Sequence, residues 1–235
     1  MPRKARIDAF GALHSITVRG FEGRNIFRED EDCDPFLERM GEILPETSTA
    51  CFAWALTSNH ARLLLRTGDT PIAMVMRRML TGYAVTYNRR HHRHGPVFLD
   101  RYRSVLCEED PYLLEMVRHI HLSPLRAGTV TDLAQLEAYP YAGHGALLGN
   151  AVPAWQDVDT VLERFAEQQD PARKAYRRYI EQEAGQGLRP ELADGGLVRG
   201  LGGWAQVRRR PGCGAPTAGD ERILGSAEFV RQVLA

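Results

Sequence analysis

The spacing of apolar residues divides the first half of the chain into short strands and longer helices. Residues 14–19 alternate polar and apolar side chains, which is typical of a half-buried strand, whereas the apolar residues of 35–44 recur at helical spacing. Residues 50–56 alternate bulky and small apolar side chains, as expected of a central strand that is covered on both faces. A short turn then leads into a further strand that begins at His60.

A second long helix, a fourth strand and a third helix follow. Thr70 and Pro71 are predicted to be the N-cap and the first residue of the second helix. Its apolar stripe comprises Ile72, Met76, Met79, Tyr83 and Tyr87. Residues 102–107 are predicted to form the fourth strand, and the third helix is expected to start at Asp110-Pro111 and to end before Pro124.

The predicted order of elements is therefore β-α-β-β-α-β-α. This order predicts an α+β fold class, with a ferredoxin-like antiparallel sheet backed by helices. The third helix is left over in that arrangement, and we expect it to bring functional groups to the sheet.

The strand that begins at His60 carries the most informative pair of side chains. Because side chains at i and i+2 share one face of a strand, His60 and Arg62 are expected to point the same way. Ala61, Leu63 and Leu65 then supply the opposite, apolar face that anchors the strand in a core. An imidazole and a guanidinium on one face of a strand are typical of a phosphate-handling site.

Composition indicates a soluble globular chain: 235 residues, of which 43% are hydrophobic and 26% charged. We expect a main domain over residues 1–150 and a helical, Gly/Pro/Arg-rich extension over 151–235. No apolar run approaches the roughly 20 residues that span a bilayer. The basic N-terminus lacks the apolar core of a signal peptide, so the cytoplasm is the expected location. The scattered cysteines predict reduced thiols rather than zinc ligands or disulfides: Cys33, Cys51, Cys107 and Cys213.

Charge is unevenly distributed although the formal net charge is zero. Residues 77–103 are densely basic, with Asp100 as the sole carboxylate. Within them, the run Arg89 to His94 has six basic or titratable side chains and no carboxylate, which favours contact with a polyanion over a merely solvated loop.

Two helices are predicted beyond residue 149, at 157–169 and 171–184. The second is either a nucleic-acid contact or a solvated amphipathic helix, because its acidic end balances its arginines. Residues 185–219 are predicted to be a linker, and Ser226 is expected to cap a last helix whose apolar face nothing later in the chain covers.

Several spaced motifs carry a resemblance to a known family. They are Ser58–Leu65, Asn88–Arg90 with Gly95, Arg101–Ser104 and Arg118–Gly128, in that order. Together they resemble the REP-associated tyrosine transposases, which belong to the HUH superfamily of single-strand DNA transposases. The resemblance covers roughly residues 1–150, and residues 220–225 match a later motif of longer members. Those longer members continue into a helix-turn-helix region, so we expect Ala235 to mark a truncated end.

The resemblance implies an enzyme of DNA transposition and recombination that acts on hairpin-bearing single-stranded DNA. In the family, a His-x-His pair binds a divalent cation, Mg²⁺ or Mn²⁺, which polarises the scissile phosphate. A tyrosine on a helix attacks that phosphate and forms a phosphotyrosyl link, and a polar ligand follows one helical turn later. Both monomers and homodimers occur among relatives, so both assemblies stay open.

This chain departs from the family pattern at the catalytic positions. Arg62 replaces the second histidine, His119 the tyrosine, and Ser123 the asparagine that follows it. A guanidinium has no lone pair to offer a metal, and His60 alone is a poor magnesium site. We expect catalysis to be lost or severely impaired. Tyr112, on the same helical face as His119, is the alternative nucleophile.

Two functions therefore remain: a DNA transposase with altered chemistry, and a non-catalytic protein that recognises a structured single strand. In both, the expected DNA contacts are Arg62, Arg77, Arg78, Arg89, Arg90, Arg93, Arg101 and Arg103.

Overall fold

A five-stranded sheet forms the centre of the molecule in a computed structural model that describes residues 7–185 and 222–235. In spatial order, its strands are β2 (Ala50–Thr57), β3 (His60–Arg66), β1 (Leu13–Arg19), β4 (Arg103–Cys107) and β5 (Ile223–Leu224). The first four strands pair antiparallel, and β5 lies parallel to β4. The predicted α+β class is thereby confirmed.

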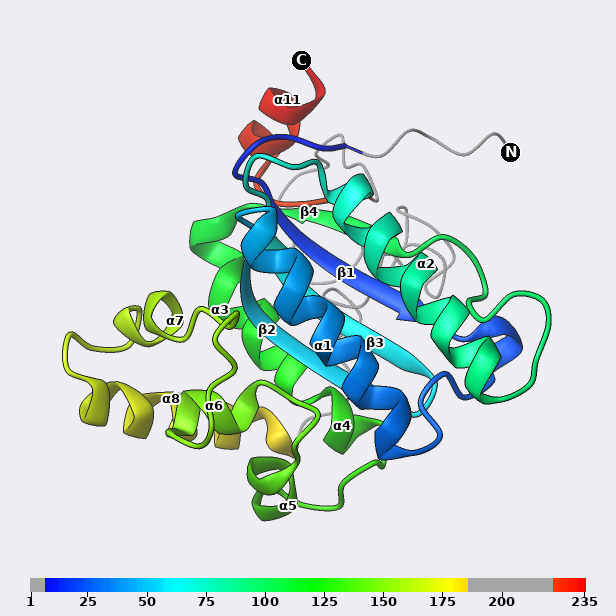
Figure 1. Ribbon diagram of the computed structural model, residues 1–235. Helices are drawn as coiled ribbons and strands as arrows, with labels where there is room; N and C mark the ends of the chain where they lie inside the picture. The colour runs from blue at the N-terminus through cyan, green and yellow to red at the C-terminus, as the bar shows by residue number, and fades with distance from the viewer. Residues whose placement is uncertain (1–6, 186–221) are drawn as a thin grey trace, which may run out of the picture.

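Helices cover both faces of the sheet, as Figure 1 shows. On one face lie α1 (Asp30–Glu46) and α2 (Ile72–Arg90), which follow a short 3₁₀ turn at Phe21–Gly23. On the other face, α3 (Glu109–His121) packs against β2 and β3. The remaining helices are α4 (Ser123–Arg126), α5 (Leu133–Ala138), α6 (His144–Leu148), α7 (Asp159–Glu163), α8 (Gln169–Ala184) and α11 (Ala227–Leu234).

The two faces of β3 point in the directions that its sequence predicts. Ala61, Leu63 and Leu65 are fully buried in the core that α1 and α2 complete. Leu64 faces the other way, into the core beneath α3, on the same side as His60 and Arg62. Strand β2 is buried on both faces, and this too confirms the sequence prediction.

Several predicted boundaries are wrong by a few residues. Helix α1 starts at Asp30 rather than at 35, because acidic side chains in a first turn are stabilised by the helix dipole. Thr70 does not cap α2, whose N-cap is Pro71. Helix α3 begins at Glu109, one residue before the predicted Asp110-Pro111 start. The helix predicted over 157–169 is reduced to the five residues of α7.

Helices on either side of residue 150 share one hydrophobic core. Ala172, Tyr176 and Ile180 of α8 are buried in the cluster that also contains Phe52 of β2 and Val117 of α3. Helix α8 is therefore amphipathic: one face packs on the main body, and the other exposes Lys174, Arg178 and Glu181 to solvent.

The C-terminal residues return to the sheet. The Ser226 side chain caps α11 by accepting from the Phe229 backbone N–H at 3.2 Å, as predicted. The apolar face of α11 is partly covered, since Val230 is buried, whereas Leu234 is half exposed. Most of the predicted linker, from residue 186 to residue 219, lies outside the described residues.

Three cysteines are buried as free thiols: Cys33, Cys51 and Cys107. Burial raises the pKa of Cys33 and of Cys107 to about 12, so neither is a ready thiolate. Cys213 lies outside the described residues. Within 7–185 and 222–235, no helix combines the length and the apolar character that crossing a bilayer requires.

Candidate functional site

Five polar side chains gather where the start of β3 meets the junction of α3 and α4. His60 and Arg62 come from β3, His119 from α3, and Ser123 and Arg126 from α4. We call them the polar cluster. Arg62, His119 and Ser123 are buried, so Arg62 is not the solvated surface charge that is the simplest interpretation of a strand arginine. The structure brings positions 60, 62, 119 and 123 together, an arrangement that the family resemblance implies.

Both ring nitrogens of His60 are engaged. Nδ1 lies 2.8 Å from Thr57 Oγ1 and 2.8 Å from Asn59 Oδ1, and Nε2 lies 3.2 Å from Ser123 Oγ. Because an amide oxygen can only accept, we infer that Nδ1 carries the proton and that Nε2 accepts from the Ser123 hydroxyl. The tight turn between β2 and β3 thus orients the ring, and a single lone pair faces α4.

His119 lies between two guanidinium groups. Arg62 Nη1 is 3.3 Å from His119 Nε2, and Arg126 Nη1 is 3.3 Å from His119 Nδ1. A neutral imidazole has one acceptor nitrogen, and an imidazolium has none. His119 is therefore neutral in this arrangement, and only one of the two contacts is a hydrogen bond. Both nitrogens that could attack a phosphate are covered by cations.

A buried carboxylate on α8 holds one of these arginines. Glu183, which is 3% exposed, pairs with Arg126 Nη2 at 2.9 Å and with Arg118 Nε at 2.6 Å. Arg118 also pairs with Glu115 and stacks on the Tyr179 ring, 3.9 Å from its centroid. Of the two carboxylates at the acidic end of α8, Glu181 is exposed, whereas Glu183 is buried between Arg118 and Arg126.

A second buried network lies deeper in the same core. The Tyr176 hydroxyl is 2.8 Å from His121 Nδ1 and 2.7 Å from His144 Nδ1, and so joins α8 to α3 and α6. Burial lowers the pKa of His144 to about 4 and that of His121 well below its usual value. It also raises the pKa of Tyr176 well above its usual value. His121 is buried in this core, and no local sequence pattern indicates its partners.

Two tyrosines of α2 and one of α3 lie away from the polar cluster. Tyr83 and Tyr87 are core residues, as predicted, and their hydroxyls donate to the backbone oxygens of Ile26 and Asn25. Tyr112 sits in the first turn of α3, about 10 Å along the helix axis from His119. It packs against the α3-side core, and burial raises its pKa, which makes its phenolate harder to form.

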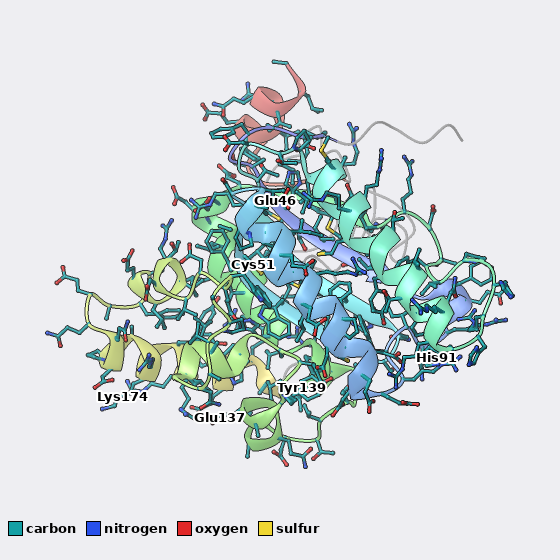
Figure 2. All side chains as sticks on the ribbon, in the orientation of Figure 1. Glu46, Cys51, His91, Glu137, Tyr139 and Lys174 are labelled. Carbon is teal, nitrogen blue, oxygen red and sulfur yellow. The ribbon has the colours of Figure 1, made fainter. Side chains whose placement is uncertain are left out.

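The arginines predicted to contact DNA differ in their surroundings. Arg78 forms a two-pronged pair with Glu46 of α1, labelled in Figure 2, and Arg90 pairs with Glu29 and Asp32. Arg62 belongs to the polar cluster, and Arg93 lies over the Tyr87 ring. No ion pair with a described residue is formed by the remaining four, which are Arg77, Arg89, Arg101 and Arg103.

The side chains of the polar cluster do not fit a divalent cation. His60 offers one lone pair, which already accepts from Ser123, and Arg62 brings a positive charge to the same face. Within the described ranges, no group of three or more His, Cys, Asp or Glu side chains is arranged to hold a metal ion. Magnesium and manganese require several oxygen or imidazole ligands, which this donor set lacks.

Comparison with known proteins identifies a shared fold. No protein-family model and no curated protein matches this sequence. Among solved structures, the chain is similar to a REP-associated tyrosine transposase bound to a REP hairpin, with a TM-score of 0.53 and 13% identity over 67% of this chain and 93% of that one. A candidate transposase from Deinococcus radiodurans R1 is more distant, with a TM-score of 0.34 and 16% identity over 48% of this chain and 91% of that one. The fold is therefore one that a DNA transposase also has.

Proposed function

We propose that this chain is a transposase-like protein that binds structured, hairpin-bearing single-stranded DNA without cutting it. The observation that carries the proposal is the fold shared with a transposase whose structure contains a DNA hairpin. The strand order β2-β3-β1-β4, with antiparallel pairing throughout, supports a ferredoxin-like sheet of the HUH type as the core of that fold. In this proposal, the polar cluster supplies the groups that bind a DNA phosphate.

In this proposal the polar cluster holds a phosphodiester by charge. Arg62 and Arg126 converge on His119 from opposite ring nitrogens, so two guanidinium groups meet at the junction of β3 and α4. A guanidinium recognises phosphate through parallel N–H donors and keeps its charge at any physiological pH. Glu183 orients Arg126 from behind through its 2.9 Å pair.

The same contacts argue against cleavage. A metal-assisted attack needs a cation beside the scissile phosphate and a nucleophile with an available lone pair. Arg62 disfavours a cation next to His60, and the ring nitrogens of His119 each face a guanidinium at 3.3 Å. Tyr112 lies too far along α3 to replace His119.

The test uses a fluorescent DNA hairpin with single-stranded flanks, incubated with the full chain and Mg²⁺ or Mn²⁺. We expect binding by fluorescence anisotropy and no covalent protein–DNA adduct on a denaturing gel. An adduct would refute the loss of cleavage, whereas an absence of binding would refute the DNA-binding function itself.

A matched pair of variants locates the binding site. Arg62→Gln is expected to weaken hairpin binding by about 1.5–3 kcal/mol, the range for a hydrogen bond to a charged group. Arg66→Gln is the control, because Arg66 lies on the same face of β3 but at its other end, over the Phe52 ring. Equal losses for both variants would contradict the assignment of the polar cluster to phosphate binding.

A reconstruction tests the correspondence with the family. The triple change Arg62→His, His119→Tyr and Ser123→Asn is expected to restore adduct formation with Mn²⁺, since it supplies two imidazoles, a phenol and an amide oxygen at one junction. Failure to cleave in a variant that still folds and binds the hairpin would contradict the alignment of these three positions.

A further inference from the structure

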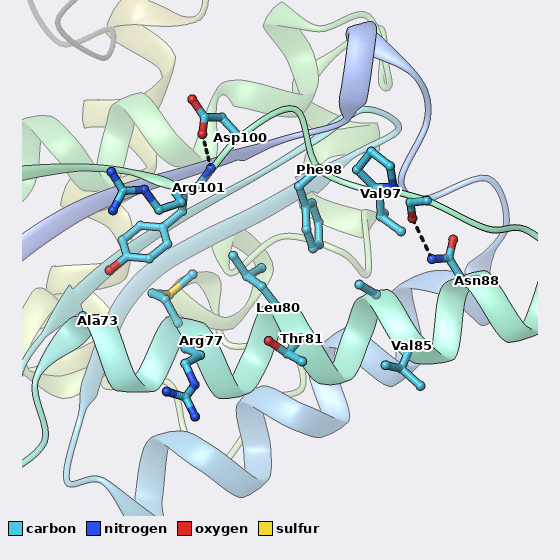
Figure 3. Close-up of a pocket in the computed structure, with 15 residues that line it drawn as sticks. Ala73, Arg77, Leu80, Thr81, Val85, Asn88, Val97, Phe98, Asp100 and Arg101 are labelled. Carbon is cyan, nitrogen blue, oxygen red and sulfur yellow. Dashed lines mark hydrogen bonds between the residues drawn. The ribbon is translucent and has the colours of Figure 1, made fainter. Parts of the chain in front are cut away.

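A groove of about 680 Å³ lies between α2 and residues 95–102, the segment that leads into β4. Figure 3 shows Leu80 of α2 facing the Phe98 ring across it. Its volume falls within the roughly 300–1,000 Å³ typical of sites for small molecules. Because α2 covers the opposite face of the sheet from the polar cluster, this apolar groove is a separate site that does not depend on the proposed DNA binding.

The apolar groove is long, and hydrocarbon side chains form most of its walls. On α2 the lining extends from Ala73 to Asn88, which is about 22 Å along the helix axis. The apolar side chains of its two walls are Met76, Leu80, Ala84, Val85, Val97 and Phe98. A ligand that is apolar over most of its length displaces water from such a surface at a gain in free energy.

Positive charge lies at the end of the groove nearest the start of α2. Arg77 of α2 and Arg101 of the facing segment both line this end and are exposed (Figure 3). Neither side chain forms an ion pair with any described residue, whereas Arg78, the next residue on α2, is paired with Glu46. Of the described residues in the lining, Asp100 alone has a carboxylate, which accepts from the Arg101 backbone N–H at 2.7 Å. This end therefore carries an excess of positive charge that attracts an anion.

The opposite end of the groove is uncharged. Its lining there consists of Val85, Asn88, Gly95 and Pro96. Asn88 Nδ2 donates to the Gly95 carbonyl oxygen at 3.0 Å, and this hydrogen bond ties the two walls together. The groove thus combines a basic end, an apolar length and a neutral end.

We propose that the apolar groove binds a long-chain carboxylate, a molecule with an unbranched apolar tail and one acidic head group. The tail lies between Leu80 and Phe98, where the burial of each methylene is favourable. The head group lies beside Arg77 and Arg101, because a guanidinium matches the paired oxygens of a carboxylate and keeps its charge at any physiological pH.

Two other ligands match this groove less well. A nucleic-acid strand needs cations along the whole path of its backbone, whereas the arginines of the lining lie at one end. An extended peptide brings backbone N–H and C=O groups, for which the apolar walls offer no partners.

The experiment uses the full chain and dansylundecanoic acid, a fluorescent carboxylate whose emission rises in an apolar site. Octanoate, laurate and palmitate then compete with it, each below the concentration at which it aggregates. We expect affinity to rise with chain length by up to about 4-fold per methylene. Dodecanol, which has the tail of laurate without its charge, is expected to bind more weakly than laurate. No rise in emission would overturn the site, and equal affinities for dodecanol and laurate would overturn the assignment to a carboxylate.

Two variants place the ligand in the groove. Ala84→Phe fills it, and Thr81→Glu puts a further carboxylate on its wall at an exposed position that leaves the core intact. Each is expected to abolish the rise in emission. The controls are Val152→Phe, which adds the same ring at an exposed position outside the groove, and Thr81→Gln. Circular dichroism checks that every variant is folded. Undiminished binding in both test variants would place the ligand elsewhere on the chain and overturn the proposal.

A second set of variants tests recognition of the head group. Arg77→Gln and Arg101→Gln are each expected to lower the affinity for laurate by up to about 5-fold, the worth of an exposed ion pair, and to leave the affinity for dodecanol unchanged. Arg78→Gln is the matched control, because Arg78 is paired with Glu46 and does not line the groove. Equal losses for laurate and dodecanol would overturn recognition by charge.

Discussion

Acid should unfold this protein through a histidine that is held neutral in the core. His144 is 3% exposed, its Nδ1 lies 2.7 Å from the Tyr176 hydroxyl, and burial lowers its pKa from 6.5 to about 4. The unfolded chain therefore binds a proton between these two pH values that the folded chain does not. The contribution of His144 to the free energy of unfolding is complete above pH 6.5. It decreases as the pH falls below 6.5 and is fully lost near pH 4.

The size of the effect follows from the same shift. At pH 5, the unfolded state is protonated at His144 while the folded state is not, and the linkage relation gives a loss of about 2 kcal/mol relative to pH 7.5. His14 contributes in the same direction, because burial lowers its pKa to about 4 as well. The total loss in the native chain should exceed that from His144 alone.

The assay is urea unfolding at pH 7.5 and pH 5, followed by Trp fluorescence and circular dichroism. His144→Asn removes the titrating group, so its free energy of unfolding should fall by about 2 kcal/mol less between the two pH values than that of the native chain. The charge of His144 also lowers the pKa of His121. Removing His144 therefore reduces the acid-induced loss due to His121 as well, which makes the difference between the variant and the native chain larger. An equal loss in both proteins would refute the assignment of a neutral, buried His144.

Three further perturbations test other parts of the structure. Glu183→Gln removes the charge between Arg118 and Arg126 and should lower the free energy of unfolding by roughly 3 kcal/mol; a change below about 1 kcal/mol, the worth of an exposed pair, would mean that solvent screens the pair. Leu64→Ala should cost about 2–5 kcal/mol in urea unfolding because Leu64 is fully buried, and a smaller cost would mean that the α3-side core collapses around the gap. Tyr112→Phe should leave hairpin binding unchanged; if the native chain forms an adduct that this variant lacks, Tyr112 is the nucleophile.

Strand β3 shows which features are predictable from sequence. Its period of two and the apolar character of Ala61, Leu63 and Leu65 determine which side faces the α1 and α2 core. His60 and Arg62 must then lie on the opposite side. That they meet His119 and Ser123 there was expected only from the family resemblance, since no local rule connects positions about sixty residues apart.

Contacts between distant segments account for most of what sequence reasoning missed. Glu183 of α8 pairs with Arg118 and Arg126. The charge pattern of α8 left open whether that helix contacts nucleic acid or is a solvated amphipathic helix. Nothing in the composition of that helix indicates that one of its carboxylates is buried, because the cause is the positive charge of α3 and α4 against which it packs.

The start of α1 shows a different limit. The acidic residues 29–32 lack apolar spacing, so periodicity alone places the helix start too late. The helix dipole, and the Asp32 carboxylate that accepts from the Arg28 backbone N–H at 2.9 Å, stabilise the earlier start.

Strand β5 has a consequence for how the protein behaves at high concentration. It pairs with Leu106 and Cys107 of β4. The backbone oxygen of Arg222, just before β5, accepts from the Leu106 N–H, and that of Leu224 in β5 accepts from the Glu108 N–H, both at 2.8 Å. Glu108 in turn accepts from both the backbone and the hydroxyl of Ser226. An outermost strand with open backbone groups invites another molecule to add a strand and begin an aggregate. Because β5 occupies that stretch of β4, its backbone groups are not available to a strand of another molecule, and aggregation through β4 is disfavoured.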